Sequence, residues 1–446
     1  MLTTDNNSLG GWLAIIDCSA QNSQLIARQI RKNHVYCELC PHTTPLAKLM
    51  ERQPKGLILA GEAAGAYADA DCSVPVLRIN FDATIDASAV VLKSNGGRLY
   101  TLELPTGMVA TQQCQQILHD FAADICGCTP EWTMSNFIKA AVAEIKEKVG
   151  SERVLCALSG GVDSSVAAAL VQRAIGEQLT CVFVNHGFMR QGEPEQVSAT
   201  FSARMGANFV PIDASERFLS KLTGVSDPEQ KRKLIGEEFI RVFEEEARRY
   251  GQARYLVQGT LYPDVIESGT ASAGVIKSHH NVGGLPEHME LDLIEPLRQL
   301  YKDEVRELGI ELGLPAALVW RQPFPGPGLA IRTVGEITRE RVQLVRRADA
   351  IVVEEIEKAG LAQAIWQYFA IITDTKSVGM MNDKRNYGYV VAIRAVDSKD
   401  AMTANWVRLP YEVLDRISSR IMNEVKQISR VVYDISSKPP ATICWE

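Results

Sequence analysis

The chain has 446 residues, of which 46% are hydrophobic and 23% charged, a composition typical of a globular protein with two to four domains. Its net charge of -7 argues against a general nucleic-acid-binding protein, because no excess of Lys and Arg is present to neutralise a phosphate backbone. Residues 1–10 are polar and no apolar run reaches membrane-spanning length, so we expect no secretory signal, no membrane span and a cytoplasmic location.

The ten cysteines are expected to be reduced thiols, since a chain of this size does not need disulfides to complete its core. Cys37 with Cys40, and Cys126 with Cys128, leave a zinc site as an alternative. Their irregular spacing and the lack of a completing histidine favour ordinary thiols.

The first region alternates strand-like and helix-like segments. Residues 12–17, 35–39, 56–60 and 74–79 are apolar runs of strand length, and residues 24–32 carry apolar side chains at helical spacing. Strands that alternate with helices predict a parallel, doubly wound α/β sheet.

Short strings in this region resemble the opening of a class I glutamine amidotransferase domain, at residues 15–17, 24–28, 41–42 and 55–59. The resemblance implies a flavodoxin-like domain, which we place at residues 1–128. It also implies a cysteine nucleophile on a tight turn after a strand, activated by a histidine that a glutamate orients.

None of the three catalytic residues of that family is present at its expected position here. Asn80 stands where the cysteine is expected, and Pro105 and Gly107 occupy the stretch in which the family carries its histidine and glutamate. Only about 25 residues separate the two positions, far fewer than a complete domain needs. Cys72 and Cys114 are alternative nucleophiles, but neither has the expected turn or a suitably placed histidine. We therefore predict a shortened domain without glutaminase activity.

Residues 124–132 contain Pro130 and predict a linker to a second domain. There an apolar strand at residues 153–158 leads into the string SGGVDSS at residues 159–165, and then into a helix-like run at residues 166–174. The two glycines allow a tight turn, and the serines place hydroxyl and N–H groups at a helix start, where phosphate is favoured. The alternative is an ordinary capped Gly-Gly turn.

This string, called the phosphate loop from here on, lacks the lysine of the G-x-x-x-x-G-K-[ST] nucleotide loop. It resembles the loop of the N-type ATP pyrophosphatases. That resemblance implies binding of the pyrophosphate end of ATP with the α-phosphate left open to attack, and so adenylylation rather than γ-phosphoryl transfer.

Strand-like runs at residues 179–184, 208–212 and 255–258 predict a second parallel sheet, whose ligands would lie beyond the carboxyl ends of its strands. The long irregular stretch at residues 262–290 contains Gly, Lys and His residues. We expect it to be a lid over a phosphate-bearing intermediate. An exposed turn is the alternative for its adjacent His279 and His280.

From residue 126 to residue 446 the chain closely resembles the GMP synthase family. The strings that carry the resemblance include LSGGVDSSV, VQGTLYPDVIESG, IKSHHNVGGLP, PFPGPGLAIR and VVYDISSKPPATICWE. The resemblance implies a doubly wound ATP pyrophosphatase domain at residues 129–326 and a small α+β domain at residues 327–446 that forms a homodimer and completes the substrate pocket. It implies that ATP, with Mg²⁺, adenylylates XMP, and that ammonia then displaces AMP to give GMP.

The resemblance also assigns roles to individual residues. Asp163 is expected near the magnesium, with Lys277 and Asp264 as further catalytic residues. The ATP phosphates are expected on Ser159, Gly160, Gly161, Val162, Asp163, Ser164 and Ser165. The nucleotide substrate is expected on Arg232, Pro325, Gly326, Arg385, Lys438 and Ile443.

Three positions depart from the family pattern. Asn185 stands where an acidic residue is usual, Asn382 replaces a glycine in a turn, and Cys444 replaces a glutamate near the C-terminus. A carboxylate lost at residue 444 would weaken XMP binding or indicate another substrate. The sequence therefore predicts a GMP synthase that takes free ammonia or ammonia from a separate glutaminase subunit. A diverged paralogue acting on another purine-like nucleotide and a non-catalytic nucleotide-binding regulator are the alternatives.

Overall fold

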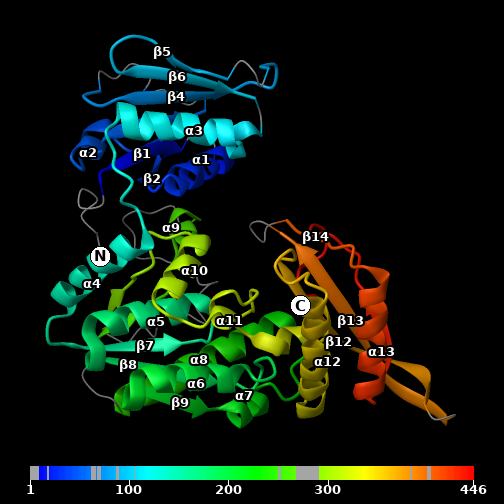
Figure 1. Ribbon diagram of the computed structural model, residues 1–446. Helices are drawn as coiled ribbons and strands as arrows, with labels where there is room; N and C mark the ends of the chain where they lie inside the picture. The colour runs from blue at the N-terminus through cyan, green and yellow to red at the C-terminus, as the bar shows by residue number, and fades with distance from the viewer. Residues whose placement is uncertain are drawn as a thin grey trace. The chain divides into compact units, whose positions relative to one another are not determined.

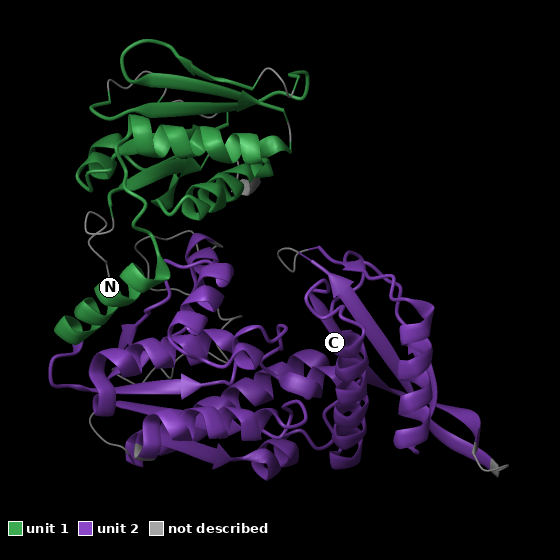
Figure 2. Cartoon of the chain, in the orientation of Figure 1, with its two compact units in different colours: residues 1–148 green, residues 149–446 purple. Residues whose placement is uncertain are grey.

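The computed structural model describes residues 10–17, 20–61, 67, 72–86, 90–105, 107–249, 253–267, 291–381, 384–398 and 403–446. The chain divides into two compact units, residues 1–148 and residues 149–446 (Figure 2). The first unit holds one sheet and the second holds two (Figure 1). In the described part of the chain, no helix is long and apolar enough to cross a membrane. The predicted domain boundaries after residues 128 and 326 stay predictions.

The sheet of the first unit has the strand order β2-β1-β3-β4-β6-β5. All neighbours are parallel except β5 and β6, which form an antiparallel edge. The order β2-β1-β3-β4 is that of flavodoxin-like folds, which confirms the predicted fold class. The strands are β1 (Trp12–Asp17), β2 (Tyr36–Pro41), β3 (Gly56–Ala60), β4 (Val76–Phe81), β5 (Leu92–Ser94) and β6 (Leu99–Leu104).

The described helices of the first unit include two amphipathic ones, α1 and α3, that contact each other, while α1 also packs on β1 and β2. Their apolar faces close the core over buried side chains of the strands. The helices are α1 (Ala20–Lys32), α2 (Leu46–Met50), α3 (Gln112–Asp120) and α4 (Met134–Val149), with short helical turns at Met108–Ala110 and Phe121–Ile125.

The second sheet is fully parallel, with the order β11-β10-β7-β8-β9. The chain passes from β7 to β8 and β9 on one side and returns to β10 on the other, so β7 and β10 flank the switch point at which such sheets bind ligands. The strands are β7 (Arg153–Leu158), β8 (Leu179–Asn185), β9 (Phe209–Asp213), β10 (Ala253–Val257) and β11 (Asp292–Ile294).

Helix α5 is buried along most of its length, including Val166 to Val171, which explains why its sequence is apolar all round rather than striped. The helices that accompany the second sheet are α5 (Val162–Ile175), α6 (Glu193–Met205), α7 (Ser215–Lys221), α8 (Pro228–Arg249), α9 (Tyr262–Glu267), α10 (Lys302–Glu311) and α11 (Ala316–Val319).

The third sheet is built on a long antiparallel hairpin, β12 with β13, to which β14 adds antiparallel and β15 parallel. Helices α12 and α13 pack on one face and bury Ala370, Ile372 and Val391. The elements are α12 (Arg339–Lys358), β12 (Gln367–Met381), β13 (Lys384–Asp397), β14 (Asn405–Trp406), α13 (Tyr411–Glu424) and β15 (Ile428–Tyr433), preceded by a 3-10 turn at Gly328–Arg332.

The segment predicted as a linker is anchored on the first unit through Trp132. The Trp132 ring is 2% exposed and lies 4.4 Å from the Tyr36 ring, between centroids. The backbone N–H of Trp132 donates to the carbonyl oxygen of His34 at 2.8 Å, and the Arg31 guanidinium lies 5.2 Å from the centre of the indole ring. Residue 132 is therefore part of the core of this unit.

We expect Trp132→Ala to destabilise β1 and β2 by about 3–5 kcal/mol, because it leaves a large cavity against Tyr36. Native-state hydrogen exchange of the amides of β1 and β2 measures this change locally. Trp320→Ala is the control, since Trp320 is 56% exposed, and it should change those amides by less than about 0.5 kcal/mol. Equal protection in the two variants would contradict the assignment of Trp132 to this core.

Candidate functional site

The phosphate loop joins the end of β7 to the start of α5. The hydroxyl of Ser164 lies 2.9 Å from that of Ser159 and donates to the carbonyl oxygen of Gly161 at 3.2 Å, so the loop is closed by its own serines. Gly160 has a φ of +78°, which L side chains rarely adopt, and a Cβ there would lie 3.3 Å from Val197. The predicted strand, tight turn and helix are present, and the first turn of α5 presents its N–H groups beyond the sheet edge.

A lysine from far along the chain reaches this loop. Nζ of Lys302, the first residue of α10, lies 2.5 Å from both carboxylate oxygens of Asp163. The start of α10 is fixed because the Tyr301 N–H donates to the Glu304 carboxylate at 2.7 Å. Gly259, just after β10, also packs against the loop, since a Cβ there would lie 3.3 Å from the backbone of Asp163. The charged pair thus joins the loop at the carboxyl end of β7 to the start of α10, which follows β11.

Sequence reasoning missed Lys302. The available signal was that the loop carries no lysine of its own, while a lysine begins a helix that returns to the carboxyl ends of the strands. The side chains of Lys302 and Asp163 are 39% and 32% exposed, so each can exchange its partner for a ligand from solvent.

Asp264 lies on α9, next to the start of α10. Its carboxylate accepts the N–H of Leu261 at 2.9 Å and so caps its own helix. The Tyr262 N–H donates to Leu300 at 3.0 Å, and the rings of Tyr262 and Tyr301 are 5.3 Å apart, which anchors α9 beside Lys302. The predicted Lys277, His279 and His280 lie outside the described residues.

Residue 446 docks on α8. The buried Lys231 ammonium binds the Glu446 carboxylate and donates to the carbonyl oxygen of Thr333 at 2.8 Å. The second carboxylate oxygen of Glu446 accepts the Gly335 N–H at 2.9 Å. Arg232 donates to the backbone carbonyl oxygen of Glu446 at 2.6 Å. The predicted substrate residue Arg232 therefore lies beside the C-terminal segment.

The C-terminal segment is held to the third sheet by Arg394, which is fully buried. Its guanidinium donates to the carbonyl oxygens of Ile443 at 2.8 Å and Thr442 at 2.9 Å, and to the Asp434 carboxylate at 2.7 Å. The predicted Ile443 is therefore fixed in place through its backbone.

Arg385 and Lys438, both expected to bind the nucleotide substrate, are not brought together within one chain. Arg385 is exposed near the start of β13, where it is opposite Met380. Lys438 pairs through its backbone with Ala404, beside the residue that pairs with Asp397 at the end of β13. At about 3.3 Å per residue, roughly 40 Å of strand separates them. Figure 1 shows β14 at one end of β13 and the hairpin running away toward the other.

Pro325 and Gly326 lie in the connection between α11 and α12. The Gly328 N–H donates to the carbonyl oxygen of Pro325 at 2.9 Å, which closes a turn, and the Leu329 N–H donates to Phe188 at 2.7 Å. This turn is thereby held against the loop that follows β8.

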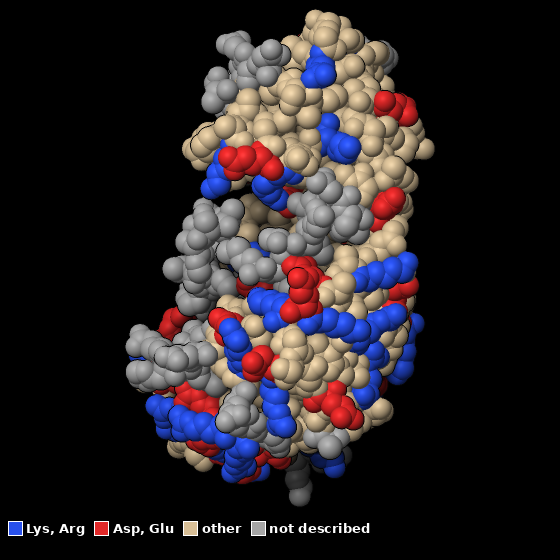
Figure 3. All heavy atoms as spheres, turned by 90° about the vertical axis from the view of Figure 1, so that its left-hand side faces the viewer, with Lys and Arg blue, Asp and Glu red and all other residues tan. Residues whose placement is uncertain are grey.

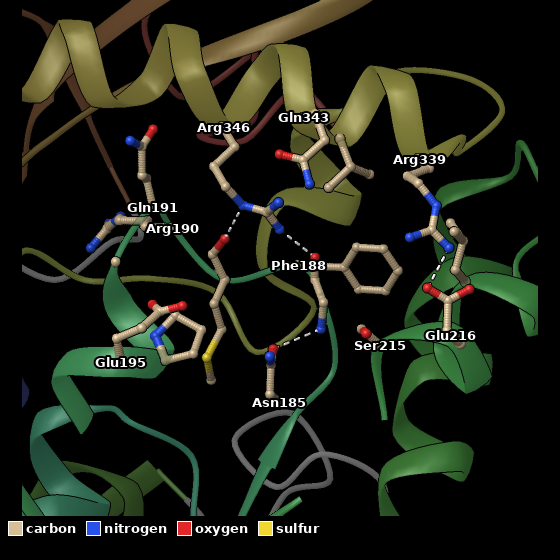
Figure 4. A pocket seen from close by; sticks show the side chains of 16 residues that line it. Asn185, Phe188, Arg190, Gln191, Glu195, Ser215, Glu216, Arg339, Gln343 and Arg346 are labelled. Carbon is tan, nitrogen blue, oxygen red and sulfur yellow. Dashed lines mark hydrogen bonds and ion pairs between the residues drawn. The ribbon is translucent and has the colours of Figure 1, made fainter. Parts of the chain in front are cut away.

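A cavity of about 310 Å³ lies between the loop after β8 and α12 (Figure 4). Its wall is held by Arg346, which donates to the carbonyl oxygens of Gly187 and, at 2.9 Å, of Met189. The amide oxygen of Asn185 accepts the Gly187 N–H at 3.0 Å. No phosphate-loop residue is among the described residues that line this cavity.

The first unit was expected to place Asn80 on a turn, and this was wrong. Strand β4 continues through Phe81, so Asn80 lies within the strand and pairs with Glu103 of β6. Pro105 follows β6, and Gly107 opens a 3-10 turn with a φ of +89°. Cys72 and Cys114 are buried, and burial raises the pKa of the Cys114 thiol to about 11, so it is protonated at neutral pH.

Charge on the protein surface is mixed. On the face drawn in Figure 3, Lys and Arg side chains lie among Asp and Glu side chains over the described residues. Within the described part of the chain, no group of three or more His, Cys, Asp and Glu side chains is close enough to hold a metal ion.

Comparison with known proteins decides the family. A family model described as NAD synthase matches residues 133–261, which include the phosphate loop, and one described as GMP synthase C terminal domain matches residues 354–445. Proteins named GMP synthase [glutamine-hydrolyzing] are 48% identical in Carboxydothermus hydrogenoformans and 49% identical in Heliobacterium modesticaldum, each over 97% of this chain and 99% of the relative. The chain belongs to the GMP synthase family.

The alignment with the Carboxydothermus GMP synthase runs over 503 residues, more than the 446 of this chain, so that relative contains stretches that this chain lacks. This agrees with a shortened member of the GMP synthase family. The first unit, with no cysteine at residue 80, is the part in which our sequence reasoning places the loss.

The contacts of two residues that depart from the GMP synthase pattern show what each side chain does in the structure. Asn185 accepts the Gly187 N–H through its side-chain oxygen, a role that an amide and a carboxylate fill equally well. Cys444 packs, with Ile443, against the apolar side chains of Phe369 and Ile371. Residue 382 lies outside the described residues.

His186, the residue that follows β8, makes the stability of the protein depend on pH. Its ring is buried, and Nδ1 accepts the Phe188 N–H at 3.1 Å. Burial, and to a smaller extent the nearby Arg346 guanidinium, lower the pKa of His186 to about 4. The ring is therefore neutral in the folded protein at physiological pH.

We expect stability to fall as the pH falls from about 6.5 to about 4, because the unfolded chain takes up a proton at His186 in that window and the folded chain does not. Above pH 6.5 the contribution is constant, and over the window the loss is about 3 kcal/mol. Urea unfolding at pH 7 and pH 4.5 measures it. His186→Gln, which keeps an acceptor without a titrating ring, should lose less stability on acidification, and equal losses would contradict the assignment.

Proposed function

We propose that this chain is an ATP-dependent ligase that aminates XMP to GMP through an adenylyl-XMP intermediate, using ammonia that it does not make itself. The observation that carries the proposal is the phosphate loop at the end of β7, closed by its serines and joined to Lys302 through Asp163. This loop has the parts needed to hold a leaving pyrophosphate.

The charged pair at the loop supplies the chemistry of the first step. When the pyrophosphate end of ATP binds the N–H groups of α5, Lys302 donates to its oxygens and stabilises the charge that develops as the α-phosphate is attacked. Asp163 is then free to hold Mg²⁺, and a single carboxylate fits, because this ion is usually bound by one or two carboxylates together with substrate phosphates. Mg²⁺ bound there would neutralise part of the pyrophosphate charge.

We place XMP beside the C-terminal segment. Arg232 binds the backbone of residue 446, and Arg394 holds the backbone of Ile443 three residues earlier. Pro325 with Gly326 forms a rigid turn within the same unit. Cys444 offers the substrate no carboxylate, which keeps another purine-like nucleotide as the second candidate substrate. We expect Asp264, on the helix that Tyr262 anchors to Leu300 and Tyr301, to act on the incoming ammonia.

The ammonia source follows from the first unit. The relatives' name includes glutamine hydrolysis, whereas here Asn80, Pro105 and Gly107 stand at the expected catalytic positions. An amide cannot form the thioester that a cysteine forms. We therefore propose that ammonia is free or comes from a separate glutaminase subunit.

We expect pyrophosphate release from ATP to require both XMP and ammonium, and glutamine to replace ammonium by less than about one part in a thousand, since the nucleophile is absent. The assay measures pyrophosphate and GMP with each nitrogen source at equal pH. Asp163→Asn is the control, with kcat lowered at least about a hundredfold. GMP formed from glutamine alone would contradict the ammonia claim, and turnover only with another nucleotide would establish the second candidate substrate.

The separation of Arg385 and Lys438 supports a homodimer. Each suits a nucleotide phosphate, yet the length of β13 keeps them apart in one chain. A second copy, related by a twofold axis, brings the start of one β13 toward the end of the other. We propose that one substrate site takes Lys438 from one chain and Arg385 from its partner.

Mixing two inactive variants tests this arrangement. Arg385→Ala and Lys438→Ala should each be inactive alone, but after mixing and exchange about a quarter of the wild-type sites should recover, because half of the dimers are mixed and one of their two sites is intact. Activity per site after exchange is the measurement. No recovery, with exchange shown by native mass spectrometry, would place both side chains in one chain's site or outside it.

A further inference from the structure

Arg321 holds the phosphate loop from behind. Its Nη1 donates to the carbonyl oxygen of Gly160 at 2.9 Å and to the Glu193 carboxylate at 2.6 Å, and its Nη2 donates to the amide oxygen of Gln196 at 2.6 Å. The side chain is 11% exposed, so these bonds form away from solvent. Neither the sequence nor the family comparison had assigned it a role.

The contact with Gly160 sets the direction of the loop's donors. In a planar trans peptide the carbonyl and the following N–H point in opposite directions. By holding the carbonyl oxygen of Gly160, Arg321 turns the N–H of Gly161 toward the other side, where it donates to Ser159 Oγ at 3.3 Å. This is the side on which the serine hydroxyls and the start of α5 form the cradle.

Arg321 is itself held independently of the loop. The Glu193 carboxylate that binds it also accepts the backbone N–H of Arg190 at 3.0 Å, so its partner keeps its place without the arginine. Glu193 and Gln196 both belong to α6, which packs on β9. The planar guanidinium can reach all three acceptors at once, whereas a lysine ammonium cannot match this geometry.

The residues that follow Arg321 connect it to the third sheet. The Gln322 side chain accepts the N–H of Tyr368 at 2.9 Å, and the Gln367 side chain donates to the carbonyl oxygen of Pro323 at 2.7 Å. Both contacts are with the first residues of β12. One short stretch of chain is therefore bonded at its first residue to the phosphate loop and at the next two to the sheet that carries the C-terminal segment.

We propose that Arg321 is a positioning residue of the phosphate loop and that it makes ATP binding depend on XMP. The inference rests on the proposed function. XMP bound beside the C-terminal segment fixes β12 and the stretch after Arg321. Because Arg321 directly precedes this stretch, its guanidinium is then fixed as well, and so is the peptide between Gly160 and Gly161 that it holds. By thermodynamic linkage, ATP must then favour XMP binding by the same factor.

Binding of α,β-methylene-ATP with Mg²⁺, measured by calorimetry with and without XMP, tests this inference. In the wild type we expect XMP to tighten the analogue several-fold. Arg321→Lys should weaken the analogue about ten- to a hundredfold and remove the effect of XMP, because the loss of charge-assisted bonds leaves the loop unheld. XMP binding alone should change less than about twofold. Gln196→Leu removes one of the three acceptors of Arg321. Its effect on analogue binding should therefore lie between those of the wild type and Arg321→Lys.

Arg204→Lys is the matched control. Arg204, also on α6, donates to the carbonyl oxygens of Leu312 at 2.8 Å and Gly313 at 3.4 Å, so it makes the same type of contact away from the loop. Wild-type analogue affinity in Arg321→Lys, or equal weakening of the analogue and of XMP, would overturn the inference. A wild type that binds neither XMP nor the analogue would instead overturn the proposed function. Linkage that is present in the wild type and unchanged in Arg321→Lys would overturn only the role of Arg321.

Discussion

The ion pair between Lys302 and Asp163 is the contact on which the proposed phosphate site depends. Asp163 lies in the first turn of α5, where the helix dipole favours an anion, and Lys302 balances the carboxylate from a helix that follows β11. Both side chains are partly exposed, so the pair itself contributes little stability and can open without unfolding the loop. The proposed ATP site, which would exchange this pair for contacts with ATP and its cation, needs a weak and accessible pair of this kind.

The two units differ in how many of the residues expected from the family resemblance they contain. The first keeps the strand order of its fold and a buried core, yet its candidate nucleophile position is occupied by Asn80 within a strand. On β4 and β6, Arg78 pairs with Thr101 and Asn80 with Glu103, so this part of the sheet presents a polar face rather than an apolar one. In the second unit, the phosphate loop and its supporting contacts are intact. This contrast is what the proposal of an external ammonia source explains.

Much of the fold could be predicted from the sequence because local patterns fix it. Strands β1, β3 and β7 are short apolar runs, and the Gly160 turn is specified by its own residues. What the sequence could not give depends on distant partners: Lys302 meets Asp163 across 139 residues, and Arg321 meets Gly160 across 161. The length of the hairpin could not be predicted, because beyond the part covered by α12 and α13 its alternation is no longer apolar on one face. The tight turn expected at Asn80 was a wrong prediction, since strand β4 continues past this residue to Phe81.

In the proposed reaction the loop binds the pyrophosphate and leaves the α-phosphate of ATP to be attacked by the substrate's base oxygen. Isotope transfer tests it most directly. XMP labelled with ¹⁸O at O2 is converted in the presence of ammonium, and the products are analysed by mass spectrometry. The account predicts one ¹⁸O atom in the phosphate of AMP and none in pyrophosphate. Label that stays out of AMP, or ADP as the nucleotide product, would contradict it.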